Sequence, residues 1–133
     1  LEAGTQNLAG IAALNAGVQY VLSHQKAIVE KEHFLLQKLY EGLTGDVEFY
    51  SSLENSTPIV ALNISGKDSA YVSDLLNYKY GIVTRCGAHC APLMHKHLKT
   101  EERGIVRLSI SFQNTIEDID FVVRAIQKIS NDY

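Results

Sequence analysis

The segment from Pro58 to Ile64 constrains the fold of this chain more than any other stretch. It reads Pro-Ile-Val-Ala-Leu-Asn-Ile, a nearly continuous apolar run between a polar turn at residues 51–57 and Gly66. The β-branched residues and the turn signals on both sides favour a strand. Because the run is apolar at successive positions, it predicts a strand that is covered on both faces. We therefore expect the core to form around this segment.

The remaining elements follow from apolar spacing. Strands are expected at residues 46–50, 82–85 and 104–111, and helices at 5–23, from the phase shift at 23–25 to about 43, at 68–81, at 92–98 and from 115 onward. In the first two helices we expect the regularly spaced apolar residues in the core: Leu8, Ile11, Leu14, Val18, Val21, Leu22, Ile28, Leu35, Leu36, Leu39 and Leu43. This order predicts an α+β fold, with a small, largely antiparallel sheet of about four strands and helices mainly on one face.

Composition excludes several classes of protein. The chain has 133 residues, of which 46% are hydrophobic and 20% charged, values typical of one globular domain. A net charge of −3 without a basic stripe argues against nucleic acid and against an anionic membrane as partners. No apolar run of spanning length and no signal peptide is visible, so we expect a cytoplasmic location. Because Leu1 is not an initiator methionine, we expect a fragment of a longer protein.

The chemistry is concentrated between Arg85 and His95, where both cysteines fall beside a predicted helix start at Pro92. A free thiol, whose pKa is about 8.5, becomes a good nucleophile near positive charge or a helix N-terminus. Cys90 has both features nearby in sequence: positive charge at Arg85 and His89, and the helix start at Pro92. Cys86 lacks the adjacent helix start and is expected to serve packing. The spacing alone leaves Cys90 open as a nucleophile or as a buried structural thiol.

A metal site is a second interpretation of this stretch. Its soft ligands are numerous enough for tetrahedral zinc: Cys86, His89, Cys90, His95 and His97. Paired Cys-x-x-Cys spacing is absent, however, and the last two histidines lie at i and i+2 of the predicted helix, on different faces. We therefore predict no metal ligands here, and a non-catalytic thiol or zinc-binding module stays as the alternative from another class.

Three motifs resemble those of class V pyridoxal-phosphate enzymes, specifically the cysteine desulfurase and selenocysteine lyase family. They are Glu2-Ala3-Gly4-Thr5 near the start, the stretch Arg85 to His95, and Gly104-Ile-Val-Arg107-Leu-Ser109 with the following Gln113 to Asp120. The motifs occur in the family's order and span nearly the whole chain. This chain lacks a residue that some family members carry between the Cys-Ala pair and Pro-Leu, so a short, ordered cysteine loop is expected.

The resemblance implies a domain organisation. Residues 1–133 would form the C-terminal domain of a class V enzyme, similar to that of fold-type I pyridoxal enzymes. A long leading helix would cover residues 5–23 and the small domain proper residues 24–133. The large cofactor-binding domain, including the Schiff-base lysine, would lie outside this chain. The fragment alone is therefore expected to be inactive and to form no adduct with pyridoxal 5'-phosphate.

The resemblance also implies roles for individual residues. Cys90 would take sulfur from L-cysteine as a persulfide, leaving L-alanine. Arg107 would clamp the substrate carboxylate; from the residue alone, a solvated arginine or an ion pair with Glu101 or Glu102 is the favoured interpretation. Arg85 would contact the substrate or support the loop. Thr5, with Gly4, would bind the cofactor phosphate across a homodimer, unless Thr5 is an ordinary helix cap.

The full-length protein implied by this resemblance is a sulfur-transfer enzyme. Its sulfur would pass to an acceptor protein or thiol, as in iron–sulfur cluster assembly. A selenocysteine lyase, or another class V aminotransferase or epimerase, is the alternative within the family. The residues that would choose between these substrates belong to the large domain.

Overall fold

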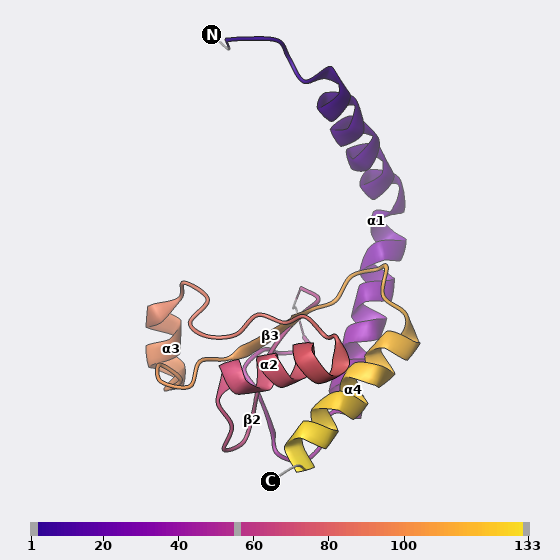
Figure 1. Cartoon of the computed structure of the whole chain (residues 1–133). Coiled ribbons are helices and arrows are strands. Elements are labelled where there is room, and N and C mark those ends of the chain that lie inside the picture. The colour runs from indigo at the N-terminus through magenta and orange to yellow at the C-terminus, as the bar shows by residue number, and fades with distance from the viewer. Residues whose placement is uncertain (1–2, 55–56, 132–133) are drawn as a thin grey trace.

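The protein is described here by a computed structural model, which covers residues 3–54 and 57–131. Its elements, in chain order (Figure 1), are α1 (Leu8–Gly42), β1 (Val47–Phe49), β2 (Ile59–Ile64), α2 (Ser69–Tyr80), α3 (Pro92–Leu98), β3 (Val106–Ser109) and α4 (Ile116–Asn131). The strands form an antiparallel sheet in the order β1-β2-β3. The α+β class and the antiparallel sheet are confirmed. Glu2, part of the first motif, lies outside the described residues.

β2 is the central strand, as its apolar sequence predicts. Val60, Leu62 and Ile64 are at most 1% exposed and face the core. On β3, Val106 and Leu108 lie opposite Leu62 and Val60, so both strands send their apolar residues to the same side. The buried cluster is completed by residues from α1, α2 and α4: Leu35, Leu36, Leu39, Val72, Leu76, Ile119, Ala125, Ile126 and Ile129. The other side of β2, which the sequence predicts to be covered as well, is only partly covered: Ile59 is exposed and Ala61 half-buried, opposite Ser109 and Arg107 of β3.

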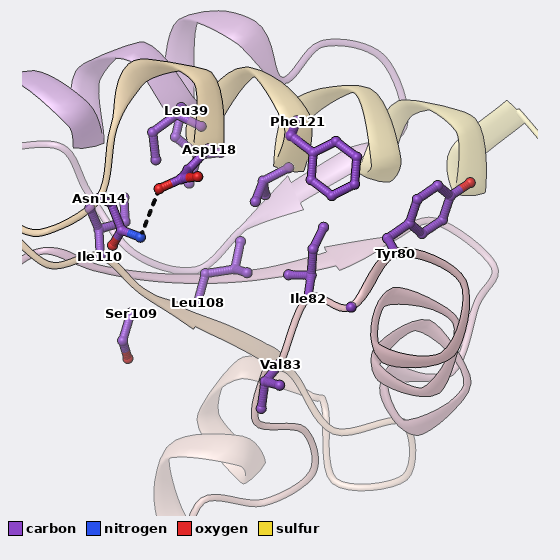
Figure 2. Close-up of a pocket in the computed structure, with 13 residues that line it drawn as sticks. Leu39, Tyr80, Ile82, Val83, Leu108, Ser109, Ile110, Asn114, Asp118 and Phe121 are labelled. Atoms are coloured by element: carbon purple, nitrogen blue, oxygen red, sulfur yellow. Dashed lines mark hydrogen bonds between the residues drawn. The ribbon is translucent and has the colours of Figure 1, made fainter.

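The expected fourth strand is not formed. Residues 82–85 pair with β3 only through an isolated bridge between Arg85 and Arg107. The physical reason lies at the end of α2, where Gly81 takes a left-handed conformation and the N–H of Ile82 donates to Leu76 O (3.0 Å). Because Ile82 is held by the helix end, the segment diverges from β3. A cleft of about 340 Å³ opens there, lined by Ile82, Val83 and Ser109 among others (Figure 2).

The first two predicted helices are one continuous helix of 35 residues, α1. The phase shift at 23–25 produces no break, and the Ser23 hydroxyl donates within the helix to Gln19 O (2.8 Å). The core assignment of the first half of α1 is wrong. Its apolar residues are 45–73% exposed: Leu8, Ile11, Leu14, Val18, Val21 and Leu22. No other element of residues 3–54 and 57–131 covers this part of the helix (Figure 1).

The second half of α1 enters the core through Leu35, Leu36, Leu39 and the following Leu43, whereas Ile28, also expected there, is only half-buried and lies outside the core cluster. The division of the chain at residue 24 stays a prediction. Across the described residues, the helices lack the length of apolar sequence that a membrane span requires.

The two halves of α1 allow a matched test of this packing. Leu36 is 1% exposed and Leu14 is 68% exposed on the same helix. We expect Leu36→Ala to lower the free energy of unfolding by about 2–5 kcal/mol, because it leaves a cavity in the core. Leu14→Ala is expected to change it by no more than about 0.5 kcal/mol. Urea unfolding of both variants measures the difference, and similar losses would contradict the observed exposure.

Candidate active site

The cysteine loop runs from Arg85 to the start of α3. α3 begins at Pro92 with Ala91 as its N-cap, so Cys90 directly precedes the cap, as predicted. The turn is closed by Ala91 N–H, which donates to Ala88 O (2.9 Å). Both thiols are free and exposed, which corrects the expectation that Cys86 serves packing. The exposed position makes Cys90 accessible to a reacting partner.

The loop backbone is unusual at three positions. Gly87, His89 and Cys90 all have positive φ angles, of 90°, 49° and 58°. For a residue with a Cβ atom, this left-handed conformation costs about 1–2 kcal/mol. Such a conformation persists only where surrounding contacts enforce it. The contacts that enforce it here connect the loop to the segment before β3.

Backbone pairing joins the start of the loop to β3. Arg85 and Arg107 exchange two hydrogen bonds, Arg85 N–H to Arg107 O (3.1 Å) and Arg107 N–H to Arg85 O (2.7 Å). Residues directly opposite each other in such a pair project their side chains from the same face of the sheet. The small Ala61 lies opposite Arg107 on β2. Two arginines therefore lie side by side on the polar face, next to a short side chain.

Arg107 has hydrogen-bonding capacity that the chain does not use. Its Nε is buried and has no hydrogen-bond partner among the described residues. The ion pairs with Glu101 or Glu102 that were open from the sequence are not formed within residues 3–54 and 57–131. Two like charges across a strand pair repel each other. The arrangement is therefore suited to an anion that binds between the two guanidinium groups.

A close approach of two glycines brings the loop against the sheet. A Cβ atom on Gly104, whose φ is +63°, would lie 2.6 Å from Gly87 Cα and 2.6 Å from Ser69 Oγ. The backbone of residues 104–106 is also held by Asn63, a buried β2 residue that donates to Gly104 O (2.8 Å) and accepts from Val106 N–H (3.3 Å). The need for glycine at Gly104 was missed in the sequence, because the contact joins residues distant along the chain.

A charged clamp secures the segment after α3. The Arg103 guanidinium donates to both Glu48 carboxylate oxygens and to the Tyr50 hydroxyl. The hydrogen bonds from Arg103, and then from Tyr50, hold the pKa of Glu48 below its usual range. Burial, followed by the bond to Glu48, raises the pKa of Tyr50, and the bond to Glu48 also raises the pKa of Arg103. The clamp connects residues 99–104 to β1 and holds the path from α3 to β3.

The histidines of the stretch do not assemble a metal site. His89 Nε2 bonds to Ile105 O (2.9 Å), and the buried His95 bonds through Nδ1 to Thr100 Oγ1 (2.9 Å). Among the described residues no group of three or more His, Cys, Asp or Glu side chains could hold a metal ion. The predicted zinc alternative therefore gains no support from the geometry.

Gly4 and Thr5 are not brought to the loop. They lie before α1, at the end of the chain that stands away from the sheet and from α3 (Figure 1). Gly4 has a left-handed backbone (φ 97°) and Thr5 is exposed. The cap of α1 is Asn7, whose side chain accepts from Gly10 N–H (3.0 Å), so Thr5 is not the helix cap. A phosphate-binding role for Thr5 stays a prediction that requires a second surface.

Comparison with known proteins decides the family. The family model described as "Aminotransferase class-V" matches residues 1–122. The chain belongs to the class-V aminotransferase family. Among curated relatives, the chain is 32% identical over 138 residues to a probable cysteine desulfurase of Methanothermobacter thermautotrophicus, covering 97% of this chain and 33% of the relative. It is 34% identical over 132 residues to a cysteine desulfurase of Escherichia coli O139:H28, covering 96% and 31%.

Solved structures share the fold. The apo structure of a cysteine desulfurase from Thermococcus onnurineus NA1 matches with a TM-score of 0.83 and 29% identity, over 97% of this chain and 32% of that chain. A decarboxylase from Sulfurospirillum multivorans also matches, with a TM-score of 0.60 at 19% identity, over 96% and 33%. That second likeness concerns the fold alone. The chain spans about a third of the length of the curated relatives and structures it matches.

The glycine contact can be tested with two substitutions. Gly104→Ala places a methyl group against Gly87 and Ser69, whereas Gly45→Ala, also at a positive φ (+85°), meets nothing within 4 Å. Both variants bear the left-handed cost of about 1–2 kcal/mol, and we expect Gly104→Ala to lose clearly more free energy of unfolding. Urea unfolding gives both values. Equal losses would mean that the loop does not need this close approach.

Proposed function

We propose that this chain is part of a cysteine desulfurase, in which it binds the substrate carboxylate and provides the sulfur-accepting thiol. The observation that carries the proposal is the pair formed by Arg85 and Arg107, with the buried, unpartnered Nε of Arg107. A planar guanidinium matches a carboxylate with two parallel hydrogen bonds. The names of the relatives, several of which are cysteine desulfurases, support cysteine as the amino acid.

Cys90 is the proposed sulfur acceptor. Its thiol is exposed, and its loop is joined by the backbone to the strand that carries Arg107. As thiolate, Cys90 Sγ attacks the sulfur of L-cysteine; a sulfur–sulfur bond forms while the carbon–sulfur bond of the substrate breaks. The bonding electron pair stays on carbon, which takes up a proton to give L-alanine, and Cys90 keeps the sulfur as a persulfide. An acceptor thiol or protein then collects it.

Pyridoxal 5'-phosphate is the cofactor that the family implies. The residues described here fit one part of it, since the arginine pair offers unused donors for the carboxylate of an amino acid held on the cofactor. When bound, the cofactor stabilises negative charge on the substrate carbon skeleton. Thr5, with Gly4, is the proposed contact to its phosphate from the second subunit of a homodimer. The lysine that holds the cofactor belongs to the large domain.

We infer the biological setting from the same family membership. The full-length enzyme would be a cytoplasmic homodimer that passes sulfur to an acceptor, including one for iron–sulfur cluster assembly. Both the dimer and the acceptor can be checked on the full-length protein, by its mass in solution and by transfer of labelled sulfur to candidate acceptors.

The arginine pair predicts a defect in substrate binding. Arg107→Ala in the full-length enzyme should raise the KM for cysteine roughly ten- to hundredfold, since a charged hydrogen bond contributes about 1.5–3 kcal/mol. Arg85→Ala should act in the same direction, and Arg124→Ala, an exposed arginine on α4, serves as the control. Steady-state kinetics of alanine release gives these values. A parental KM for Arg107→Ala would assign the carboxylate to other residues.

Replacing the two cysteines one at a time should affect alanine release differently. We expect Cys90→Ser to reduce alanine release from L-cysteine at least a hundredfold, because no thiol is left to accept the sulfur, while Cys86→Ser keeps the parental rate within about threefold. Alanine is quantified in the presence of excess reductant, which regenerates the thiol. Parental activity of Cys90→Ser would refute the proposed nucleophile. Selenocysteine is assayed alongside, and loss of activity toward cysteine alone would point to a lyase assisted by the thiol.

A further inference from the structure

The segment containing Cys90 continues the pairing with the β3 strand for one more step, and the way this pairing ends is informative. After the exchange between Arg85 and Arg107, Ile105 N–H donates to Gly87 O (3.2 Å). In a regular antiparallel ladder, Gly87 N–H would donate back to Ile105 O. Instead, Gly87 N–H donates to Ser69 Oγ (3.3 Å). The carbonyl of Ile105 therefore lacks its usual backbone partner.

The ring of His89 takes that place. His89 Nε2 lies 2.9 Å from Ile105 O, and since a carbonyl oxygen only accepts, Nε2 must carry the proton. Ile105 is 4% exposed, so with the ring in place its carbonyl depends on His89 for a donor. The histidine thus ends the ladder with a side chain where the backbone has turned away. It is the contact that allows the chain to leave the strand at this point.

The turn that begins there carries the thiol. His89 and the next residue, Cys90, are the two consecutive left-handed residues of the loop. Ile105, to which the ring is bonded, lies two residues before Arg107. The hydrogen bond therefore connects the backbone that sets the position of the thiol to the strand that sets the position of the substrate carboxylate. The ring of His95, whose centroid is 6.1 Å from that of His89, lies on the α3 side of this contact.

We propose that His89 is a positioning residue of the desulfurase reaction, which fixes the Cys90 thiol relative to the arginine pair through its hydrogen bond to Ile105. The inference rests on the proposed function. The ring acts through the backbone, so it should affect the step in which the thiol reacts more than substrate binding. Arg85 and Arg107 are paired by their own backbone bonds and do not depend on the ring.

Three substitutions in the full-length holoenzyme separate the hydrogen bond from the backbone conformation. His89→Gln keeps a donor that reaches Ile105 O, and His89→Met has similar length without a donor. His89→Asn tolerates the left-handed conformation well but is too short to reach. We expect His89→Met and His89→Asn to lower kcat for alanine release at least tenfold with KM within threefold, and His89→Gln to stay within threefold of the parent. His97→Gln, an exposed histidine on α3, is the control.

A second measurement follows the thiol without turnover. In a Cys86→Ser background, the rate at which iodoacetamide alkylates Cys90 should differ from the parental rate in His89→Met and His89→Asn and should match it in His89→Gln. Equal kinetics of His89→Gln and His89→Met, a rise confined to KM, or full activity of His89→Asn would overturn the proposal. Cys90→Ser is run in parallel. Its activity tests the proposed function, so an inactive Cys90→Ser beside fully active His89 variants would reject the positioning role alone.

Discussion

The backbone pairing of residues 85–87 with residues 105–107 is the constraint on which the candidate site depends. It aligns Arg85 with Arg107 on one face and delivers the chain to the turn that carries Cys90. The pairing is short, because α2 holds Ile82 at one end and the loop turns away at the other. The proposed carboxylate site and the proposed reacting thiol are thereby positioned by the same few hydrogen bonds. β3, which carries Arg107, is in turn paired with β2, and β2 with β1.

Gly104 and Asn63 allow the cysteine loop to pack closely against the segment that leads into β3. Gly104 approaches Gly87 and Ser69 more closely than a residue with a Cβ atom could, and Asn63 places an amide against the backbone where a strand of apolar residues would offer none. Asn63 is 1% exposed and both of its polar atoms are used, so its burial carries no unsatisfied group. An apolar side chain at this position would remove the amide that donates to Gly104 O.

Much of the fold could be predicted from local signals. The central strand, the start of α3 at Pro92 and the capping box of α4 between Thr115 and Asp118 all follow from neighbouring residues. For α2 the sequence offers Asp68 or Ser69 as the cap, and the structure uses Asp68. Burial of the first half of α1 was wrong, because an amphipathic pattern shows that a face is apolar and not what covers it. The fourth strand was wrong because Val83, apolar and flanked by β-branched residues, is 83% exposed on a segment diverted by the end of α2.

The site was predictable in its residue types and not in its geometry. The cysteine and both arginines can be found from the motifs, yet their alignment follows from a pairing between residues 22 apart, which no local pattern encodes. From the sequence, His89 was a neighbour of Cys90 and a candidate zinc ligand, whereas in the structure its ring replaces a backbone donor. Roles for Thr5 and Gly4 stay predictions, since they lie far from the loop (Figure 1).

The identity of the thiol that receives the sulfur tests this account most directly. The full-length enzyme would be mixed with L-cysteine without reductant, trapped with an alkylating reagent, digested and examined by peptide mass spectrometry. The account predicts one extra sulfur atom on the peptide of Cys90, located by fragmentation to that residue, with Cys86 carrying only the alkyl group. Extra sulfur on Cys86, or none on either cysteine while alanine accumulates, would contradict it.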